Sequence, residues 1–134
     1  MKNVSFLLPL VLLMSINMIS CNKDVEKVKC TADIKMYFHN QTDQRISNLI
    51  VNDVIVGVIP KGSNSGEVCF DTFGTDTGFP DCRLTGMYDG EILESTCQFY
   101  WCGTEKSTLS PGTYHININL VSWDNKKYFS LDFR

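Results

Sequence analysis

Residues 116–133 read ININLVSWDNKKYFSLDF, and this stretch decides the fold class. A two-residue turn at Asp124-Asn125 would place each side chain opposite one of like character across an antiparallel hairpin. The pairs on one face are Leu120 with Phe129, Ile118 with Leu131 and Ile116 with Phe133; those on the other are Val121 with Tyr128, Asn119 with Ser130 and Asn117 with Asp132. Because a slip of one residue would mix the two faces, the pattern predicts this register.

The chain from residue 33 onward has the same character. Isoleucine, valine, threonine and aromatic residues form short runs that glycine, asparagine, aspartate and proline interrupt, and no long run has a helical period. We expect about eight short antiparallel strands, at 34–39, 46–51, 54–59, 67–73, 82–88, 91–102, 113–123 and 127–133. Such frequent turns favour an all-β, two-sheet sandwich of immunoglobulin-like character, with a small closed β-barrel as the alternative.

Two further hairpins can be predicted from their turns. A turn at Asn52-Asp53 pairs the flanking apolar residues, and a turn at Asp89-Gly90 does the same farther along the chain. The expected pairs are Val51 with Val54, Leu49 with Val56, Ile46 with Ile59, Leu84 with Ser95 and Cys82 with Cys97. The first hairpin is apolar on both faces, so we expect one face in the core and the other under a neighbouring loop. The alternative is that this second face is presented to a partner.

The N-terminus carries a separate signal. Lys2 precedes an apolar run at 4–19, which is interrupted by Pro9 and Asn17 and ends in Met18-Ile19-Ser20-Cys21. These 16 residues are fewer than the roughly 20 that a spanning helix needs, and the pattern indicates an export signal that is cleaved before Cys21. An ordinary secretory signal and a retained anchor are the alternatives.

Met18 to Cys21 resembles the lipobox of bacterial lipoproteins, in which the cysteine carries the lipid. The resemblance implies that residues 1–20 are removed and that Cys21 anchors the protein to a membrane of the cell envelope. Residues 22–29 are mostly charged and loosely resemble the surface-export signal of Bacteroidota lipoproteins. Asn22 is not the aspartate of the inner-membrane retention signal. The outer membrane, on its periplasmic or surface face, is therefore the expected location.

The domain organisation follows from these segments. Residues 1–20 are the expected signal peptide, residues 21–32 a lipidated cysteine and charged tether, and residues 33–134 a single β-sandwich domain. The formal net charge of the whole chain is −3, and it becomes −4 when Lys2 leaves with the signal. A mildly acidic chain without a basic cluster is a poor match to nucleic acid, which we exclude as a partner.

The cysteines predict disulfides rather than a metal site. With Cys21 lipidated, five cysteines remain in an oxidising compartment. Cross-strand pairing makes Cys82 with Cys97 the best bridge, and Cys30 with Cys69 is the expected second one, which leaves Cys102 over. No Cys-x-x-Cys motif occurs and neither histidine has a ligand spacing, so we expect no metal and no cofactor.

No catalytic constellation stands out, and we expect a protein that is not an enzyme. Asp71, Asp76 and Asp81 are evenly spaced and could ligate calcium, but turns around the nearby glycines explain them better. Asn40-Gln41-Thr42 matches the glycosylation sequon, a short pattern that also occurs by chance.

One surface is a candidate binding site. By strand alternation, Tyr100, Val121, Trp123 and Tyr128 lie on the faces opposite Trp101 and Leu120. Exposed aromatic rings on a sheet suit sugar rings or a protein partner, although a loop packed over them is the alternative. We therefore expect a membrane-anchored, non-catalytic binding module for a protein or a glycan. The alternative is an envelope-bound inhibitor or immunity protein that acts against a toxin or hydrolase.

Overall fold

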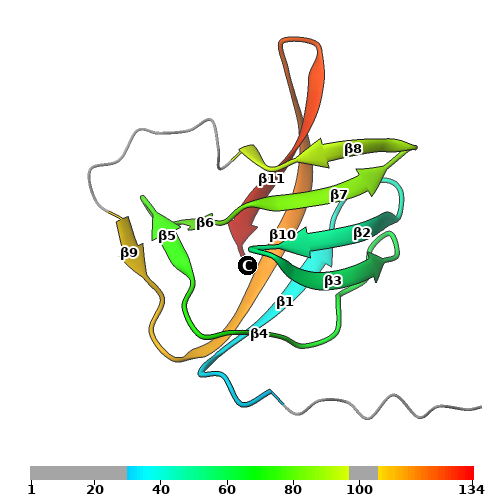
Figure 1. Ribbon diagram of the computed structural model, residues 1–134. Helices are drawn as coiled ribbons and strands as arrows, with labels where there is room; N and C mark the ends of the chain where they lie inside the picture. The colour runs from blue at the N-terminus through cyan, green and yellow to red at the C-terminus, as the bar shows by residue number, and fades with distance from the viewer. Residues whose placement is uncertain (1–29, 97–105) are drawn as a thin grey trace, which may run out of the picture.

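The computed structural model describes residues 30–96 and 106–134, and these residues form β-strands joined by turns and loops (Figure 1). The strands are β1 (Ile34–Asn40), β2 (Ile46–Val51), β3 (Val54–Ile59), β4 (Val68–Phe70), β5 (Gly74–Asp76), β6 (Phe79–Asp81), β7 (Leu84–Tyr88), β8 (Glu91–Glu94), β9 (Lys106–Thr108), β10 (Gly112–Trp123) and β11 (Lys126–Phe133). Within the described ranges, no helix has the length and apolar character needed to cross a membrane.

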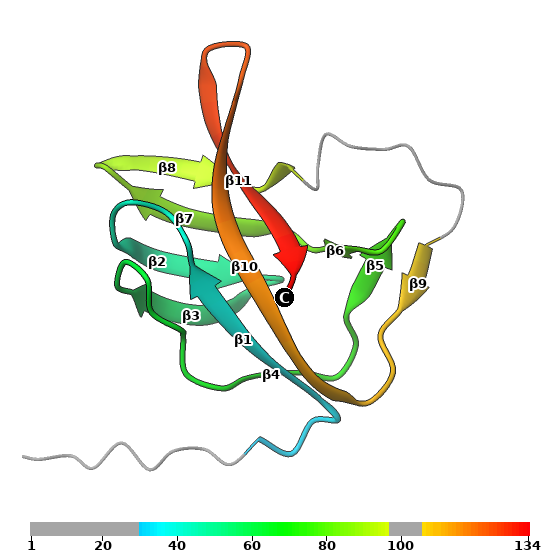
Figure 2. The same cartoon turned by 180° about the vertical axis from the view of Figure 1, so that it is seen from behind.

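Two four-stranded sheets form the layers of the fold. Sheet A has the order β11-β10-β1-β4 and sheet B the order β3-β2-β7-β8, while a small sheet C, β6-β5-β9, lies to one side. Figure 1 views the molecule from the sheet B side and Figure 2 from the sheet A side. The buried side chains lie between the layers, with Phe38, Phe129 and Leu49 among the largest. An all-β sandwich is thus confirmed, and the closed barrel is wrong because the described sheets stay open.

The hairpin of residues 116–133 has the predicted register at every position. Ile116 faces Phe133, Leu120 faces Phe129 and the intervening pairs follow in step. Its turn residues have positive φ angles, 49° at Asp124 and 60° at Asn125, which is the geometry of a tight two-residue hairpin turn. Aspartate and asparagine tolerate this left-handed backbone better than most residues, so the local sequence specifies the turn.

The central strand of sheet A joins the two ends of the domain. β1 runs parallel to β10, from Ile34 beside Gly112 to Asn40 beside Ile118, and antiparallel to β4 on its other side. Parallel neighbours cannot be joined by a tight turn, and here the whole of sheet B lies between them in sequence. The expectation of antiparallel strands throughout is thus wrong for this pair. Within sheet A the hairpin β10–β11 is hydrogen-bonded to β1, and β11 also packs beside β6 and β8.

The first hairpin departs from the predicted register in its middle. Val51 faces Val54 and Ile46 faces Ile59 as predicted, but Leu49 faces Gly57 instead of Val56. Both strands depart from regular backbone there, with φ angles of 51° at Asn48 and 95° at Gly57. These irregularities compensate, so the register recovers at the far end. They also bring Ile46 and Leu49, three residues apart, into the core together, which strict alternation did not predict.

Three other strands are shorter than expected. The predicted strand 67–73 is β4 followed by a bend, and the next strand, β5, begins at Gly74. The predicted strand 82–88 begins only at Leu84, and β8 ends at Glu94, where the predicted strand 91–102 continued. The register of this second hairpin is nevertheless the predicted one, because the Ser95 amide donates to the Leu84 carbonyl (2.9 Å). Residues 97–102 lie outside the described residues.

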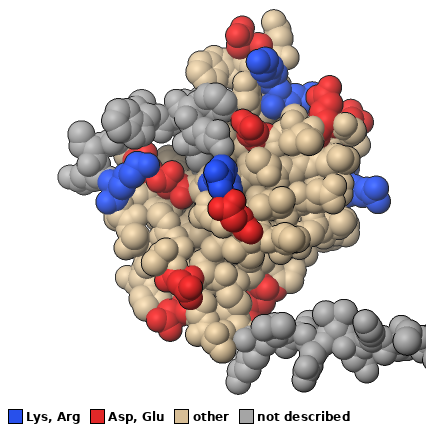
Figure 3. All heavy atoms as spheres, viewed as in Figure 1, with Lys and Arg blue, Asp and Glu red and all other residues tan. Residues whose placement is uncertain are grey.

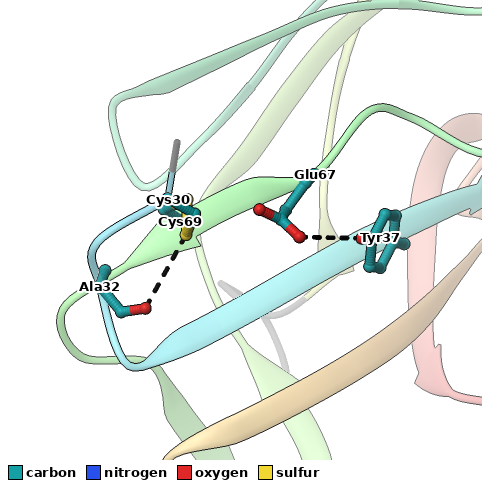
Figure 4. The surroundings of a disulfide bond; sticks show 5 residues. All are labelled: Cys30, Ala32, Tyr37, Glu67 and Cys69. Carbon is teal, nitrogen blue, oxygen red and sulfur yellow. Dashed lines mark hydrogen bonds between the residues drawn. A yellow bond between two sulfur atoms is a disulfide. The ribbon is translucent and has the colours of Figure 1, made fainter. Parts of the chain in front are cut away.

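The predicted Cys30–Cys69 disulfide is present. Its Cα atoms are 5.7 Å apart, and it fastens the first described residue to β4, the edge strand of sheet A (Figure 4). Cys82 is buried in the core. Its predicted partner Cys97 lies outside the described residues, as does Cys102, so the second bridge stays a prediction.

Removing the Cys30–Cys69 bridge should lower stability without changing the fold. Its two ends are 39 residues apart, and the chain-entropy model gives a loop of that length about 4 kcal/mol. We expect the double variant Cys30→Ser/Cys69→Ser to unfold at a correspondingly lower urea concentration. The matched control is Cys102→Ser, which removes a cysteine that neither predicted bridge uses and leaves this bridge intact. A double variant with the wild-type urea midpoint would show that the bridge contributes no stability.

Asn40 holds the loop after β1 in place. It is fully buried, and its side-chain amide donates to the carbonyls of Gln44 (2.8 Å) and Ile59 (3.0 Å). Its carbonyl oxygen accepts from the amide and hydroxyl of Thr42, at 2.9 and 2.6 Å. Every hydrogen-bonding position of the Asn40 side chain is used inside the protein. The sequon at Asn40 is therefore a structural motif and presents no accessible amide for a glycan.

Replacing Asn40 should be costly. Asn40→Ala would leave several buried polar groups without partners, at about 1–3 kcal/mol for each, and we expect a loss on the order of 3 kcal/mol in unfolding free energy. The measurement is urea denaturation followed by circular dichroism. Gln41→Ala, which alters the exposed neighbour, is the control and should change stability by less than about 0.5 kcal/mol. Equal losses for the two variants would contradict this role.

A further side-chain hydrogen bond joins the loop after β1 to sheet B. The hydroxyl of Tyr88, at the end of β7, donates to the carboxylate of Asp43. This bond, followed by burial and nearby negative charge, raises the pKa of Tyr88 to about 12. The same bond holds the pKa of Asp43 below its ordinary value. The Tyr88 ring packs edge-on against Phe129 of sheet A, so this contact also bridges the two layers.

Candidate binding cleft

The exposed large hydrophobic residues of the described chain fall into two groups. Ile50, Ile55, Val58 and Ile92 belong to sheet B, whereas Phe79, Val121 and Trp123 belong to the other end of the molecule. Single exposed apolar residues are ordinary, but several exposed apolar residues gathered in one place indicate a surface that binds a ligand or a partner. The two groups differ in chemistry, because the first is purely aliphatic and the second contains two aromatic rings.

Phe79, Val121 and Trp123 all line one cleft of about 480 Å³. Its lining residues come mainly from the β5–β6 hairpin and the outer half of the β10–β11 hairpin. Figures 1 and 2 show the ribbons of these two hairpins. The volume falls within the usual range for small-ligand sites, about 300–1,000 Å³. Phe79 is 59% exposed and Trp123 is 55% exposed. Two large rings so open to solvent in one hollow are the strongest indication of a binding site here.

Local backbone geometry positions these side chains. Thr77 and Gly78 form the turn between β5 and β6 with φ angles of 46° and 86°, and Phe79 follows the turn directly. Trp123 is the last residue of β10 before its own turn. Both residues therefore stand beside hairpin turns, and both rings are largely exposed.

The structure places part of the predicted aromatic surface in this cleft. Val121 and Trp123 line it, while Tyr128 pairs with Val121 across the ladder and is half-buried. Tyr100 lies outside the described residues. Phe79 was missed, because the segment 74–81 was interpreted as a loop. The signal that could have found Phe79 is Thr77-Gly78, a turn between two three-residue strands.

Polar groups complete the lining of the cleft. Its hydroxyl groups come from Thr77, Thr96, Ser122 and Ser130, and its carboxylates from Asp76 and Asp81. Asp81 is paired with Lys106 at 3.0 Å. One oxygen of Asp76 is buried and has no hydrogen-bond partner among the described residues.

A strip of polar side chains runs from the cleft along the outer face of sheet A. Residues at alternate positions of β10 share that face, so Asn117 and Asn119 continue the side that carries Val121 and Trp123. The amide groups of Asn117 and Asn119 donate to the two oxygens of Asp132, at 3.0 and 2.7 Å. We call Asn117, Asn119, Asp132 and His39, which lies beside Asn117 in the ladder, the polar strip.

The strip ends in an ordered pair of rings. Tyr37 stacks on His115 with ring centroids 5.1 Å apart, and its hydroxyl donates to Glu67 at 3.0 Å (Figure 4). That hydrogen bond, together with partial burial and the carboxylate charge, raises the pKa of Tyr37 above its ordinary value. Beside it, His39 and Asn64 share a hydrogen bond of 2.9 Å. The outer face of sheet A is thus rich in oriented hydrogen-bonding groups.

The outer face of sheet B is the aliphatic face, consisting of Ile50, Ile55, Val58 and Ile92. Ile50 and Ile55 are cross-strand partners, and Ile55 is 79% exposed. Figure 3 shows this side of the molecule, where uncharged atoms cover most of the surface over β2 and β3. The expectation that a loop covers the second face of the first hairpin is therefore wrong. The hairpin presents that face to solvent.

The residues considered for metal binding do not form a cation site. Cys30, Glu67 and Cys69 lie together, but the two sulfur atoms are joined to each other and are not thiolate ligands. Asp76 and Asp81 line the cleft, whereas Asp71 lines a separate pocket beside the disulfide. The three aspartates that could have ligated calcium are thus not gathered in one place.

Comparisons with known proteins identify no family for this chain. No protein-family model, no curated protein and no solved structure matches the chain. The geometry and chemistry of the surfaces described above are therefore the basis for any functional proposal.

Proposed function

We propose that this protein is a membrane-anchored envelope lipoprotein that acts as a non-catalytic binding module for a protein or a glycan, with the cleft as its binding site. The observation that supports this most is the convergence of Phe79, Val121 and Trp123 on a single cleft with hydroxyl and carboxylate groups. An apolar hollow with a few polar groups is the usual form of a ligand site.

The position of Cys30 limits how far the domain can lie from an anchor. Cys30, where the described chain begins, lies at the end of the sandwich opposite the β10–β11 turn (Figure 1). If Cys21 carries lipid, the eight residues 22–29 can span at most about 28 Å, because an extended chain covers about 3.5 Å per residue. The attachment point then lies within about that distance of Cys30, at the end of the domain away from the β10–β11 turn.

The aliphatic face supports a second candidate function, an envelope-bound inhibitor or immunity protein that neutralises a toxin or hydrolase. Ile50 and Ile55 are adjacent aliphatic side chains, with Thr85 beside Ile50 in the ladder. Such a mostly aliphatic surface does not suit a small polar ligand. It resembles the core of a protein–protein interface, which is depleted of charge. The two functions thus use different surfaces and can be separated by substitution.

Trp123→Ala should abolish binding through the cleft. Trp123 is largely exposed, so its loss should leave the fold intact while removing one aromatic wall. We expect the variant to lose the envelope component that the wild-type protein retains in an affinity experiment. The matched control is Ile55→Ser, which changes a still more exposed apolar residue on the aliphatic face and should retain that component.

The reverse result would favour the second candidate function over the first. Loss of binding in Ile55→Ser with normal binding in Trp123→Ala would favour the inhibitor or immunity protein. Normal binding in both variants would contradict a role for either surface.

The anchor can be tested independently of any ligand. Cells grown with labelled palmitate should incorporate the label into the wild-type protein, because acyl chains on a new N-terminal cysteine provide the attachment. Cys21→Ser should be unlabelled and should partition into the soluble fraction. An unlabelled wild-type protein would contradict the lipoprotein assignment and leave the cleft proposal unaffected.

A further inference from the structure

We infer that the ligand of the cleft is a neutral oligosaccharide, with one sugar ring against the aromatic walls of the cleft and the next rings over the polar strip. This inference rests on the proposed function, in which the cleft is the binding site. It commits to the glycan alternative and makes a protein ligand an outcome of the test.

The walls of the cleft suit a ring that has one apolar face. Phe79 and Trp123 both line the hollow, and both are more than half exposed. The negative face of an aromatic ring attracts the weakly positive hydrogens of a C–H group. A sugar ring presents several such hydrogens on one side and hydroxyl groups around its rim, so it can satisfy an aromatic wall and a polar lining together.

The polar lining favours a ligand with many hydroxyl groups. Four of the lining residues are serine or threonine, whose hydroxyls both donate and accept hydrogen bonds. A sugar carries hydroxyl groups around its ring, so it can both donate to and accept from these side chains.

The charges favour a neutral sugar over an acidic one. The described lining of the cleft contains two carboxylates and no lysine or arginine, and only Asp81 is balanced by a neighbouring cation, Lys106. A uronate or phosphorylated sugar would bring its negative charge close to Asp76. Such like-charge contacts disfavour binding.

The polar strip extends the site beyond a single ring. Ser130 lines the cleft and faces Asn119 across the β10–β11 ladder, so the strip begins at the wall of the cleft. From there it offers the partly exposed amide of Asn119 and, beside the buried Asn117, the partly exposed ring of His39. Asp132 holds both amides in place, which reduces the ordering cost of binding.

The experiment is titration calorimetry of the full chain in detergent with neutral hexose and N-acetylhexosamine tri- to pentasaccharides. The corresponding monosaccharides and uronate-containing oligomers are compared with them. We expect at least one neutral oligosaccharide to bind, with an affinity that changes less than twofold between low and high salt, because no charge pair forms.

Trp123→Ala and Phe79→Ala should each weaken binding on the order of tenfold or more. Asn119→Ala should weaken the longer oligomers about threefold and leave the monosaccharide unchanged, while Ile55→Ser should bind like the wild type.

The outcomes separate this inference from the proposed function. If no neutral sugar binds the wild type, but Trp123→Ala still loses an envelope protein that Ile55→Ser retains, the cleft is a binding site and the ligand class is wrong. If a uronate binds better than its neutral counterpart, or if salt abolishes binding, the neutral class is again wrong. If sugars bind equally well to the wild type, Trp123→Ala and Phe79→Ala, the cleft is not the site and the proposed function fails with the inference.

Discussion

The parallel ladder between β1 and β10 is the constraint on which the rest of the sandwich depends. It joins residues 34–40 to residues 112–118 and places β1 between the long hairpin and β4. Without it, β10 and β11 would form only a two-stranded ladder, which is marginally stable alone in water, and would keep the packing of β11 beside β6 and β8. The ladder also brings alternate residues of both strands to one outer face, so His39 of β1 lies beside Asn117 of β10. The polar strip is a product of this pairing.

Local sequence predicted the hairpins, because their turns are specified by a few residues. Asp124-Asn125, Asn52-Asp53 and Asp89-Gly90 all have positive φ angles, and the flanking registers follow from these turns. The parallel ladder was not predicted, because nothing in the β1 sequence distinguishes a neighbouring strand from one more than 70 residues away. The irregularities at Asn48 and Gly57 were missed for a different reason: strict alternation was applied to a stretch that is apolar at nearly every position, where it cannot locate an insertion.

Related reasons explain why part of the candidate site was predicted from the sequence and part was missed. Val121 and Trp123 were found because they lie on a strand whose register was certain, so their outward face could be read directly. Phe79 lies on a three-residue strand, too short for any periodic pattern to identify. Its approach to Trp123 also depends on how β6 packs beside β11, a long-range contact that no local rule describes. The bridge from Cys30 to Cys69 could be proposed only by elimination among the cysteines, since its ends are 39 residues apart.

The aliphatic face differs from the cleft in how a partner could approach it. β3 is an edge strand, and an exposed edge normally invites another chain to add a strand. Here Gly57, at a φ of 95°, interrupts the regular backbone of β3 midway, and such bulges disfavour continuous pairing with a new strand. A protein that binds sheet B would then contact the side chains of Ile50 and Ile55 rather than extend the sheet. The cleft is lined by aromatic rings and hydroxyl groups and therefore suits a different kind of ligand. Because the cleft and the aliphatic face share no residue, a substitution in one can leave the other unchanged.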